Sequence, residues 1–300
     1  MSRLAKTGNK EVRNVAEPAK APFAVPSVKP ETLILPPRGM ALPAGQELLN
    51  SGELLFFLIW RDLRVRYRQT AMGVLWILFQ PVLTTFIFTL IFGKLARLAS
   101  DGLPYVVFAF SALVLWHYFS GALGRAANSL VLHNQLITKV YFPRLIIPLA
   151  AVLSGLIDFA ISFVFLLLLM LFYRIPFGLS ILWCPIFLLQ AVISALGVGF
   201  WLAALNVRYR DANLAIPFLT QLWLYATPVI YSLAALPATW RRLLAVNPLT
   251  GAIVGFRWAL TGHGRPGSWI FLVSAGMGVL SLIGGLLYFL RVERRFADEI

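Results

Sequence analysis

Four arginines occur within eight residues of this chain, at positions Arg61, Arg64, Arg66 and Arg68, and a long apolar run follows them. Arginine clusters of this kind have two uses beside a membrane. They mark the cytoplasmic flank of a membrane span, and on an amphipathic helix they bind anionic lipid headgroups. The chemistry indicated by this cluster is therefore contact with a charged lipid surface.

Residues for catalysis or metal binding are sparse. The only Gly-Lys pair, Gly93-Lys94, lacks the other residues of a nucleotide-binding loop, and Cys184 lies alone in an apolar run. The three histidines show no metal-ligand spacing, and the carboxylates form no acidic cluster. We therefore expect no catalytic residue, no metal site and no cofactor in this chain, so any energy for its work must come from another protein.

Asp158 is the one acidic residue near the middle of an apolar run. An ionisable group at such a position is costly and suggests a function. Because a proton relay normally uses several such groups, we favour a structural or channel-facing polar contact. His117 and Arg125 lie nearer the end of a predicted span, where their side chains are expected to reach toward the interface.

Composition places the chain in a membrane. It has 300 residues, of which 59% are hydrophobic and 13% are charged, whereas soluble domains carry about 25% charged residues. The net charge of +14 would suggest nucleic acid in a soluble protein. Here the positive residues cluster beside apolar spans, so we expect membrane lipids and no nucleic acid as partners.

The chain divides into a proline-rich arm, residues 1–46, predicted to be disordered, and a membrane domain, residues 47–300. An amphipathic interfacial helix is predicted over 51–69, with Asp62 paired to Arg66 four residues later. Six apolar spans should follow, because each has about 20 mostly apolar residues. They cover 72–92, 104–123, 145–173, 177–205, 212–233 and 269–290.

Two short apolar runs lie between the last two spans, within residues 237–262, and favour two short helices on the outer face over the alternative of an ordered external loop. Orientation follows from the positive charges, because twelve lie on one side of the predicted spans and seven on the other. The excess places both termini in the cytoplasm.

Aromatic residues are frequent in three of the spans. They are either anchors at the membrane interface or surfaces on which sugar rings stack, and the residue types alone leave both open. The candidates for lining a channel are Trp76, Trp116, Tyr118, Phe119, Trp223, Tyr225 and Tyr231.

Four blocks of sequence, in order, resemble the permeases of ABC-2 type exporters. They are residues 60–81 with their Arg cluster and Gln80-Pro81, residues 139–148, residues 206–217, and residues 227–257 with Thr227-Pro228 and Asn247-Pro248. The likeness covers about residues 50–300. It is greatest to the subfamily that exports O-antigen, capsular polysaccharide and teichoic acid.

The resemblance implies an all-α membrane protein with the type V exporter fold, a transport subunit and not an enzyme. It would lie in the cytoplasmic (inner) membrane as a homodimer that works with two copies of a separate ATPase subunit, which would hold ATP and Mg²⁺. The short outer helices would be gate helices. The segment with Gln135, Thr138, Lys139 and Tyr141 would couple to the ATPase.

The implied cargo is a lipid-linked polysaccharide. Arg61, Arg64, Arg66 and Arg68 would then bind the pyrophosphate of the lipid carrier, since guanidinium groups bind phosphate oxygens bidentately. The alternative is that these arginines serve only topology and ordinary lipid. Other functions left open are export of a drug or lipid, a membrane enzyme acting on lipid-linked sugars, and a secondary transporter.

Overall fold

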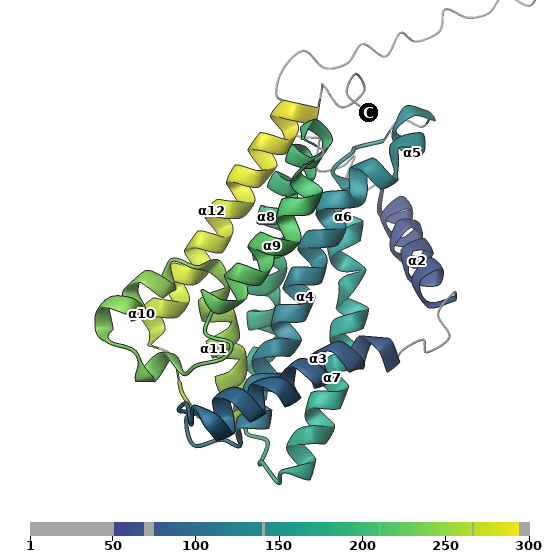
Figure 1. The fold of residues 1–300 in the computed structure, drawn as a ribbon. Helices are drawn as coiled ribbons and strands as arrows, with labels where there is room; N and C mark the ends of the chain where they lie inside the picture. Colours follow the sequence, from purple (N-terminus) through teal and green to yellow (C-terminus); the bar gives the residue numbers. More distant parts are fainter. Residues whose placement is uncertain (1–50, 69–74, 140–141, 210, 266, 294–300) are drawn as a thin grey trace, which may run out of the picture. The chain divides into compact units, whose positions relative to one another are not determined.

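A computed structural model describes residues 51–68, 75–139, 142–209, 211–265 and 267–293, all in one compact unit of the chain. These residues form helices joined by short turns, and no strand occurs among them (Figure 1). Helices suit an apolar chain because they satisfy their own backbone hydrogen bonds within lipid. The predicted arm, residues 1–46, lies outside the described residues.

Five helical stretches are long and apolar enough to cross a membrane, which indicates a multi-pass membrane protein. Two of them are single helices and three join two helices end to end. They are α3 (Leu75–Phe88) with the π-helix η1 (Thr89–Leu95), α4 (Tyr105–Leu132), α6 (Ile146–Leu153) with α7 (Gly155–Phe172), the 3₁₀ helix η2 (Leu179–Trp183) with α8 (Cys184–Arg208), and α12 (Ser268–Glu293).

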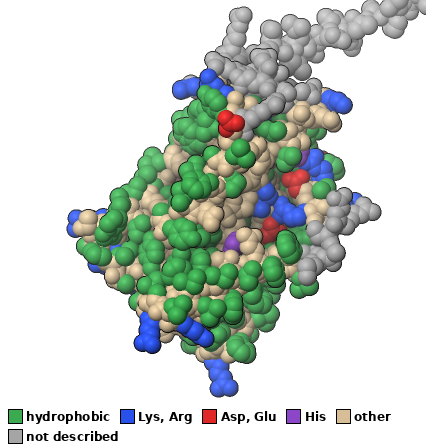
Figure 2. Space-filling view, viewed as in Figure 1, with side chains coloured by type: hydrophobic (Ala, Val, Ile, Leu, Met, Phe, Trp, Pro, Cys, Tyr) green, Lys and Arg blue, Asp and Glu red, His purple; other side chains and the backbone are tan. Residues whose placement is uncertain are grey.

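These stretches match five of the predicted spans, with changes at their ends. The span predicted over 104–123 continues as α4 for nine further residues, to Leu132. The start of the span predicted over 72–92 lies partly outside the described residues. Hydrophobic side chains cover most of the face shown in Figure 2, as expected for helices that cross lipid, whereas Lys and Arg lie at its margins and in one group beside acidic side chains.

The span predicted over 212–233 is wrong as a single helix. Its helix, α9, covers Ala212–Tyr225, about 21 Å of length, against the roughly 30 Å of a bilayer core. Pro228 has no backbone N–H and disfavours a helical conformation at Thr227, so the chain turns here. The Thr227 hydroxyl donates to the Trp223 carbonyl and accepts from Asn247 Nδ2, at 2.8 and 2.9 Å.

Two short helices follow this turn and the 3₁₀ helix η3 (Leu233–Ala235), as predicted for residues 237–262. They are α10 (Ala238–Ala245) and α11 (Pro248–Thr261), bent by 108° from each other. The Asn247 side chain accepts from Leu249 N at 3.1 Å, and Pro248 suits the first helical position. The pair meets the length and apolarity of one bent span, so the described residues hold five or six spans.

Arg257 fixes α11 to the turn after α9. Its side chain is buried and donates to the carbonyls of Pro228 and Val229, at 3.1 and 3.3 Å. Its guanidinium also lies 3.6 Å from the centre of the Phe108 ring on α4. The cation is thus held by two carbonyl dipoles and an aromatic face, which joins three elements.

The helix α2 (Gly52–Arg68) confirms the predicted helix to within one residue at each end. Leu58 is buried and packs in a cluster with Leu130 and Ile146, so one face of α2 lies on α6 (Figure 1). Phe56 and Trp60 remain exposed on the other side of α2. This helix is therefore apolar both toward the bundle and away from it, with arginines between.

Close packing of α8 on α12 depends on two glycines. A Cβ atom on Gly197 would lie 2.5 Å from Leu282 N, and one on Gly285 would collide with the Gly197 carbonyl. Because both contacts are to backbone, neither helix can absorb a side chain by a rotamer change.

We expect Gly197→Ala to lower the free energy of unfolding by about 1–3 kcal/mol, the usual cost of overpacking. Thermal unfolding of the purified protein in detergent measures this loss. Gly276→Ala on α12 is the matched control, because a Cβ there meets nothing within 4 Å. Equal melting temperatures for the two variants would contradict the packing described here.

Candidate functional site

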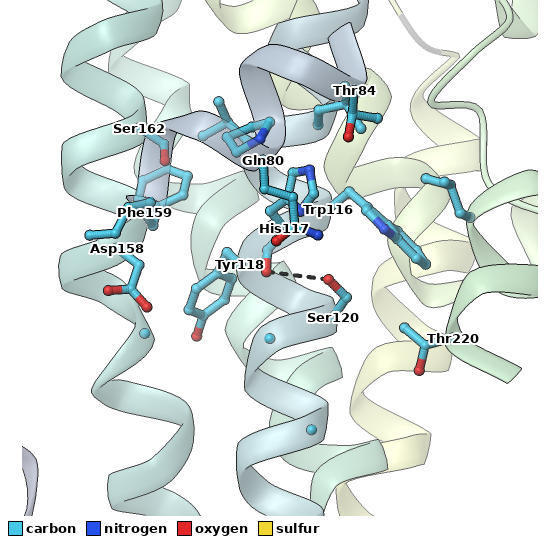
Figure 3. A pocket seen from close by; sticks show the side chains of 18 of the residues that line it. Gln80, Thr84, Trp116, His117, Tyr118, Ser120, Asp158, Phe159, Ser162 and Thr220 are labelled. Carbon is cyan, nitrogen blue, oxygen red and sulfur yellow. Dashed lines mark hydrogen bonds between the residues drawn. The ribbon is translucent and has the colours of Figure 1, made fainter. Parts of the chain in front are cut away.

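A cavity of about 680 Å³ lies between α3, α4, α7 and α9. Its wall mixes hydroxyl, amide and aromatic side chains, several of which appear in Figure 3. Gln80 and Thr84 come from α3, Ser120 from α4, Ser162 from α7 and Thr220 from α9. The cavity therefore brings polar side chains together between helices that are otherwise apolar enough to lie in lipid.

Four of the seven predicted channel aromatics line this cavity, namely Trp76, Trp116, Tyr118 and Tyr225. Trp76 and Tyr225 are more than half exposed, whereas Trp116 and Tyr118 are nearly buried.

The other three aromatics lie outside the cavity lining. Phe119 is fully buried and packs edge-on against Trp223, with ring centroids 5.2 Å apart. Tyr231 lies beyond the end of α9 and donates its hydroxyl to the Tyr225 carbonyl at 3.4 Å. The channel-lining role of the whole set stays a prediction.

Asp158 lies in the cavity wall, in the first turn of α7, and joins three elements. Arg66 Nη1 from α2 donates to its Oδ2 at 2.5 Å, and the Tyr67 hydroxyl donates to its Oδ1. Arg125 Nη1 from α4 lies 3.7 Å from Oδ2. We name Arg66, Tyr67, Arg125 and Asp158 the charged cluster.

The geometry of the charged cluster fits the polar contact expected for Asp158. Burial and the hydrogen bond to Asp158 raise the pKa of Tyr67 above its usual value, so its hydroxyl stays protonated and donates. Figure 2 shows acidic and basic side chains together on an otherwise hydrophobic face. The cluster carries two guanidinium groups and one carboxylate.

The four predicted arginines do not act as one set. Arg61 pairs with Asp62 at 3.0 Å and contacts His133 Nε2 at the end of α4. The predicted pair of Asp62 with Arg66 is thus replaced, because Arg66 reaches Asp158 instead. Arg64 is exposed, and the side chain of Arg68 lies outside what the structure describes.

Arg125 and Tyr67 are the functional candidates that the sequence did not reveal. Arg125 was expected to reach toward the interface, but its Nε donates to the Ala151 carbonyl at 3.0 Å and it turns toward Asp158. An unpaired acid near mid-span was a signal that a basic partner had to exist. That partner, Arg125, is 33 residues away in sequence, so it could be identified only from the packing of α4 on α7.

His117 also lies on the cavity wall, contrary to the expectation that it reaches the interface. Its Nε2 and the Tyr118 hydroxyl are buried, and neither finds a hydrogen-bond partner among the described residues. Buried polar atoms normally have a partner, so these two atoms are open to a ligand or to water.

The predicted coupling segment forms the short helix α5 (Asn134–Lys139). Ile137 is buried and anchors it, whereas Gln135 and Lys139 are exposed. The structure describes no side chain for Thr138, and Tyr141 lies outside the described residues. The part of α5 that is described thus presents polar side chains on an anchored helix.

We expect Asp158→Ala to cost about 1–3 kcal/mol of stability, because two guanidinium groups lose a charged acceptor. Asp211→Ala, at an exposed position, is the control. Differential scanning fluorimetry of both variants measures the difference. A melting temperature for Asp158→Ala equal to that of the control would refute the role given to the charged cluster.

Comparison with known proteins agrees with this architecture. Residues 53–261 match the family described as ABC-2 type transporter. The O-antigen export system permease protein RfbA of Myxococcus xanthus is 29% identical over 257 residues, which are 85% of this chain and 98% of that protein. A protein of the same name from Klebsiella pneumoniae is 27% identical over 247 residues, 82% of this chain and 94% of the relative.

The family match covers more than half of the chain, and it includes α2, the charged cluster and every helix that lines the cavity. From its sequence, its apolar helices and this match, the chain belongs to the ABC-2 type transporter family.

Proposed function

We propose that this chain is the transmembrane permease subunit of an ATP-driven exporter that moves a lipid-linked polysaccharide, such as an O-antigen, across the cytoplasmic membrane. The relatives' names supply the cargo class. The observation that carries the proposal is the cavity, whose wall combines aromatic faces with hydroxyl and amide groups.

This wall suits a sugar chain that must move. Trp76 and Tyr225 offer exposed aromatic faces on which the apolar faces of pyranose rings stack. Gln80, Thr84 and Thr220 offer hydrogen bonds to sugar hydroxyls in place of water. Contacts of this kind are individually weak, so successive sugars can pass without being held.

A second copy of the chain completes the path. The helices α3 and α9 flank the cavity, and both expose large apolar side chains, among them Phe79, Phe86, Leu214 and Phe218. Apolar helix faces beside a polar cavity suit a homodimer in which two cavities join as one channel. Both termini then lie in the cytoplasm, and α10 with α11 forms the gate on the outer side.

Energy comes from two copies of a separate ATPase subunit, which bind ATP with Mg²⁺. α5 is the docking element, with Gln135, Thr138, Lys139 and Tyr141 at or beside it.

Among the arginines of α2, Arg64 is exposed, whereas Arg61 and Arg66 already contact Asp62 and Asp158. Of the three α2 arginines whose side chains the structure describes, Arg64 is thus the one that most readily meets the pyrophosphate of the lipid carrier.

The decisive experiment is co-purification with the candidate ATPase, followed by ATPase assays with and without lipid-linked glycan. We expect a stable complex whose ATP hydrolysis responds to the glycolipid. Lys139→Glu should weaken the complex, because it reverses the charge of an exposed residue on α5. Arg242→Glu, on α10, is the control and should leave the complex intact. A chain that never binds an ATPase would refute the proposal.

Trp76→Ala should slow glycan export several-fold while preserving the complex, because it removes an exposed aromatic face of the cavity. Trp183→Ala is the matched control, since Trp183 is also exposed but lies in η2, outside the cavity lining. Export into inverted vesicles, followed with labelled glycolipid, measures both variants. Equal export rates would argue against a sugar path along this wall.

A further inference from the structure

We propose that Arg125 and Tyr118 form a phosphate-binding site inside the cavity, separate from the exposed Arg64 of α2. The ligand is the phosphate group of a lipid, either the pyrophosphate of a glycan carrier or the headgroup of an anionic phospholipid. The cargo identity rests on the proposed function, but the site itself is argued from the charged cluster and its surroundings.

The first argument is charge. Within the charged cluster, Arg66 and Tyr67 both donate directly to the Asp158 carboxylate, so they use its two oxygens. Arg125 has only the longer contact of 3.7 Å to the same carboxylate and a bond to a neutral carbonyl. Two guanidinium groups with one carboxylate leave one positive charge in excess, and it resides at Arg125. A positive charge in a partly enclosed cavity attracts an anion.

The second argument is the space made for this guanidinium. A Cβ atom on Gly155 would collide with Arg125 Nη2, and one on Gly121 would lie 2.9 Å from Nη1. Both glycines line the cavity. The absence of side chains at these two positions is therefore what lets the Arg125 guanidinium lie at the wall between α4 and α7.

The third argument is a second donor at the same place. The Tyr118 ring lies against the same glycine, with Cε2 3.4 Å from where a Gly155 Cβ would be. Its ring packs edge-on against Phe159, at 6.0 Å between centroids, and Figure 3 shows Tyr118 beside Asp158 on the wall. The buried Tyr118 hydroxyl has no partner among the described residues. An anion beside Arg125 would give this hydroxyl an acceptor.

Phosphate suits these donors. Its oxygens accept several hydrogen bonds at once, and guanidinium Nη groups with a hydroxyl form a matching set of donors. Such a site lies deeper than Arg64, so a lipid phosphate would move from the exposed helix α2 to the wall of α4. The sugars attached to that phosphate would then lie along the aromatic part of the same cavity.

The test measures binding of polyprenyl pyrophosphate without any glycan to the purified permease–ATPase complex in phosphatidylcholine nanodiscs. We expect Arg125→Gln to weaken binding by about ten- to a hundredfold, as loss of a charge-assisted hydrogen bond implies. Arg125→Lys should weaken binding less than Arg125→Gln, because it keeps the charge but loses the paired Nη donors. Tyr118→Phe should weaken binding by a few-fold, and Arg208→Gln, an exposed arginine outside the cavity lining, should not change it.

Two results would overturn the site. One is wild-type binding by Arg125→Gln. The other is an equal loss by Arg125→Lys and Arg125→Gln together with an equal fall in melting temperature, which would mean that Arg125 serves only packing through the Ala151 carbonyl.

Competition separates the two sources of phosphate. If phosphatidylglycerol displaces the probe at equal concentration in an Arg125-dependent manner, the site holds and its occupant is a bilayer phospholipid. Weak competition supports the carrier. The binding test contains no glycan, so it does not depend on the proposed cargo. If binding depends on Arg125 but lipid-linked glycan leaves the ATPase activity of the complex unchanged, the proposed cargo is rejected and the phosphate site is retained.

Discussion

A carboxylate within an apolar span must be neutralised by its surroundings, and Asp158 imposes this constraint on the fold. Its partners come from different parts of the chain, since α2 supplies Arg66 and Tyr67 and α4 supplies Arg125. The helix that precedes the first span is thereby tied to α7, in addition to its apolar contact with α6. The same constraint brings charge into the wall of a cavity that is otherwise aromatic and uncharged.

Around this constraint, α4 acts as the central element. It packs against α3, α6, α7, α8, α9 and α11, and its side chains from Val107 to Trp116 are all buried. One stretch of α4 is different, because His117, Ser120 and Gly121 open onto the cavity. Because one part of α4 is buried among other helices and the next part turns polar groups to the cavity, this helix both supports the fold and forms the site.

The sequence allowed prediction of the elements that depend on local signals. Helical spacing and an arginine face located α2, and apolar length located five spans. The stop of α9 at Tyr225 was missed although Pro228 was visible, because a proline can also kink a span that continues. What keeps this turn is distant: Asn247 and Arg257 bind its hydroxyl and its carbonyls. In the site, the lone Asp158 was recognisable, but its partner Arg125 depended on how two helices pack.

The position of Arg257 has a consequence for how this region can vary among homologous chains. Its cation is satisfied by two backbone carbonyls, which any residue provides, and by the one ring of Phe108. The contact itself therefore does not depend on the side chains of residues 228 and 229. We expect Phe108 and Arg257, by contrast, to be substituted together. An alignment of homologous chains would then show covariation between these two positions.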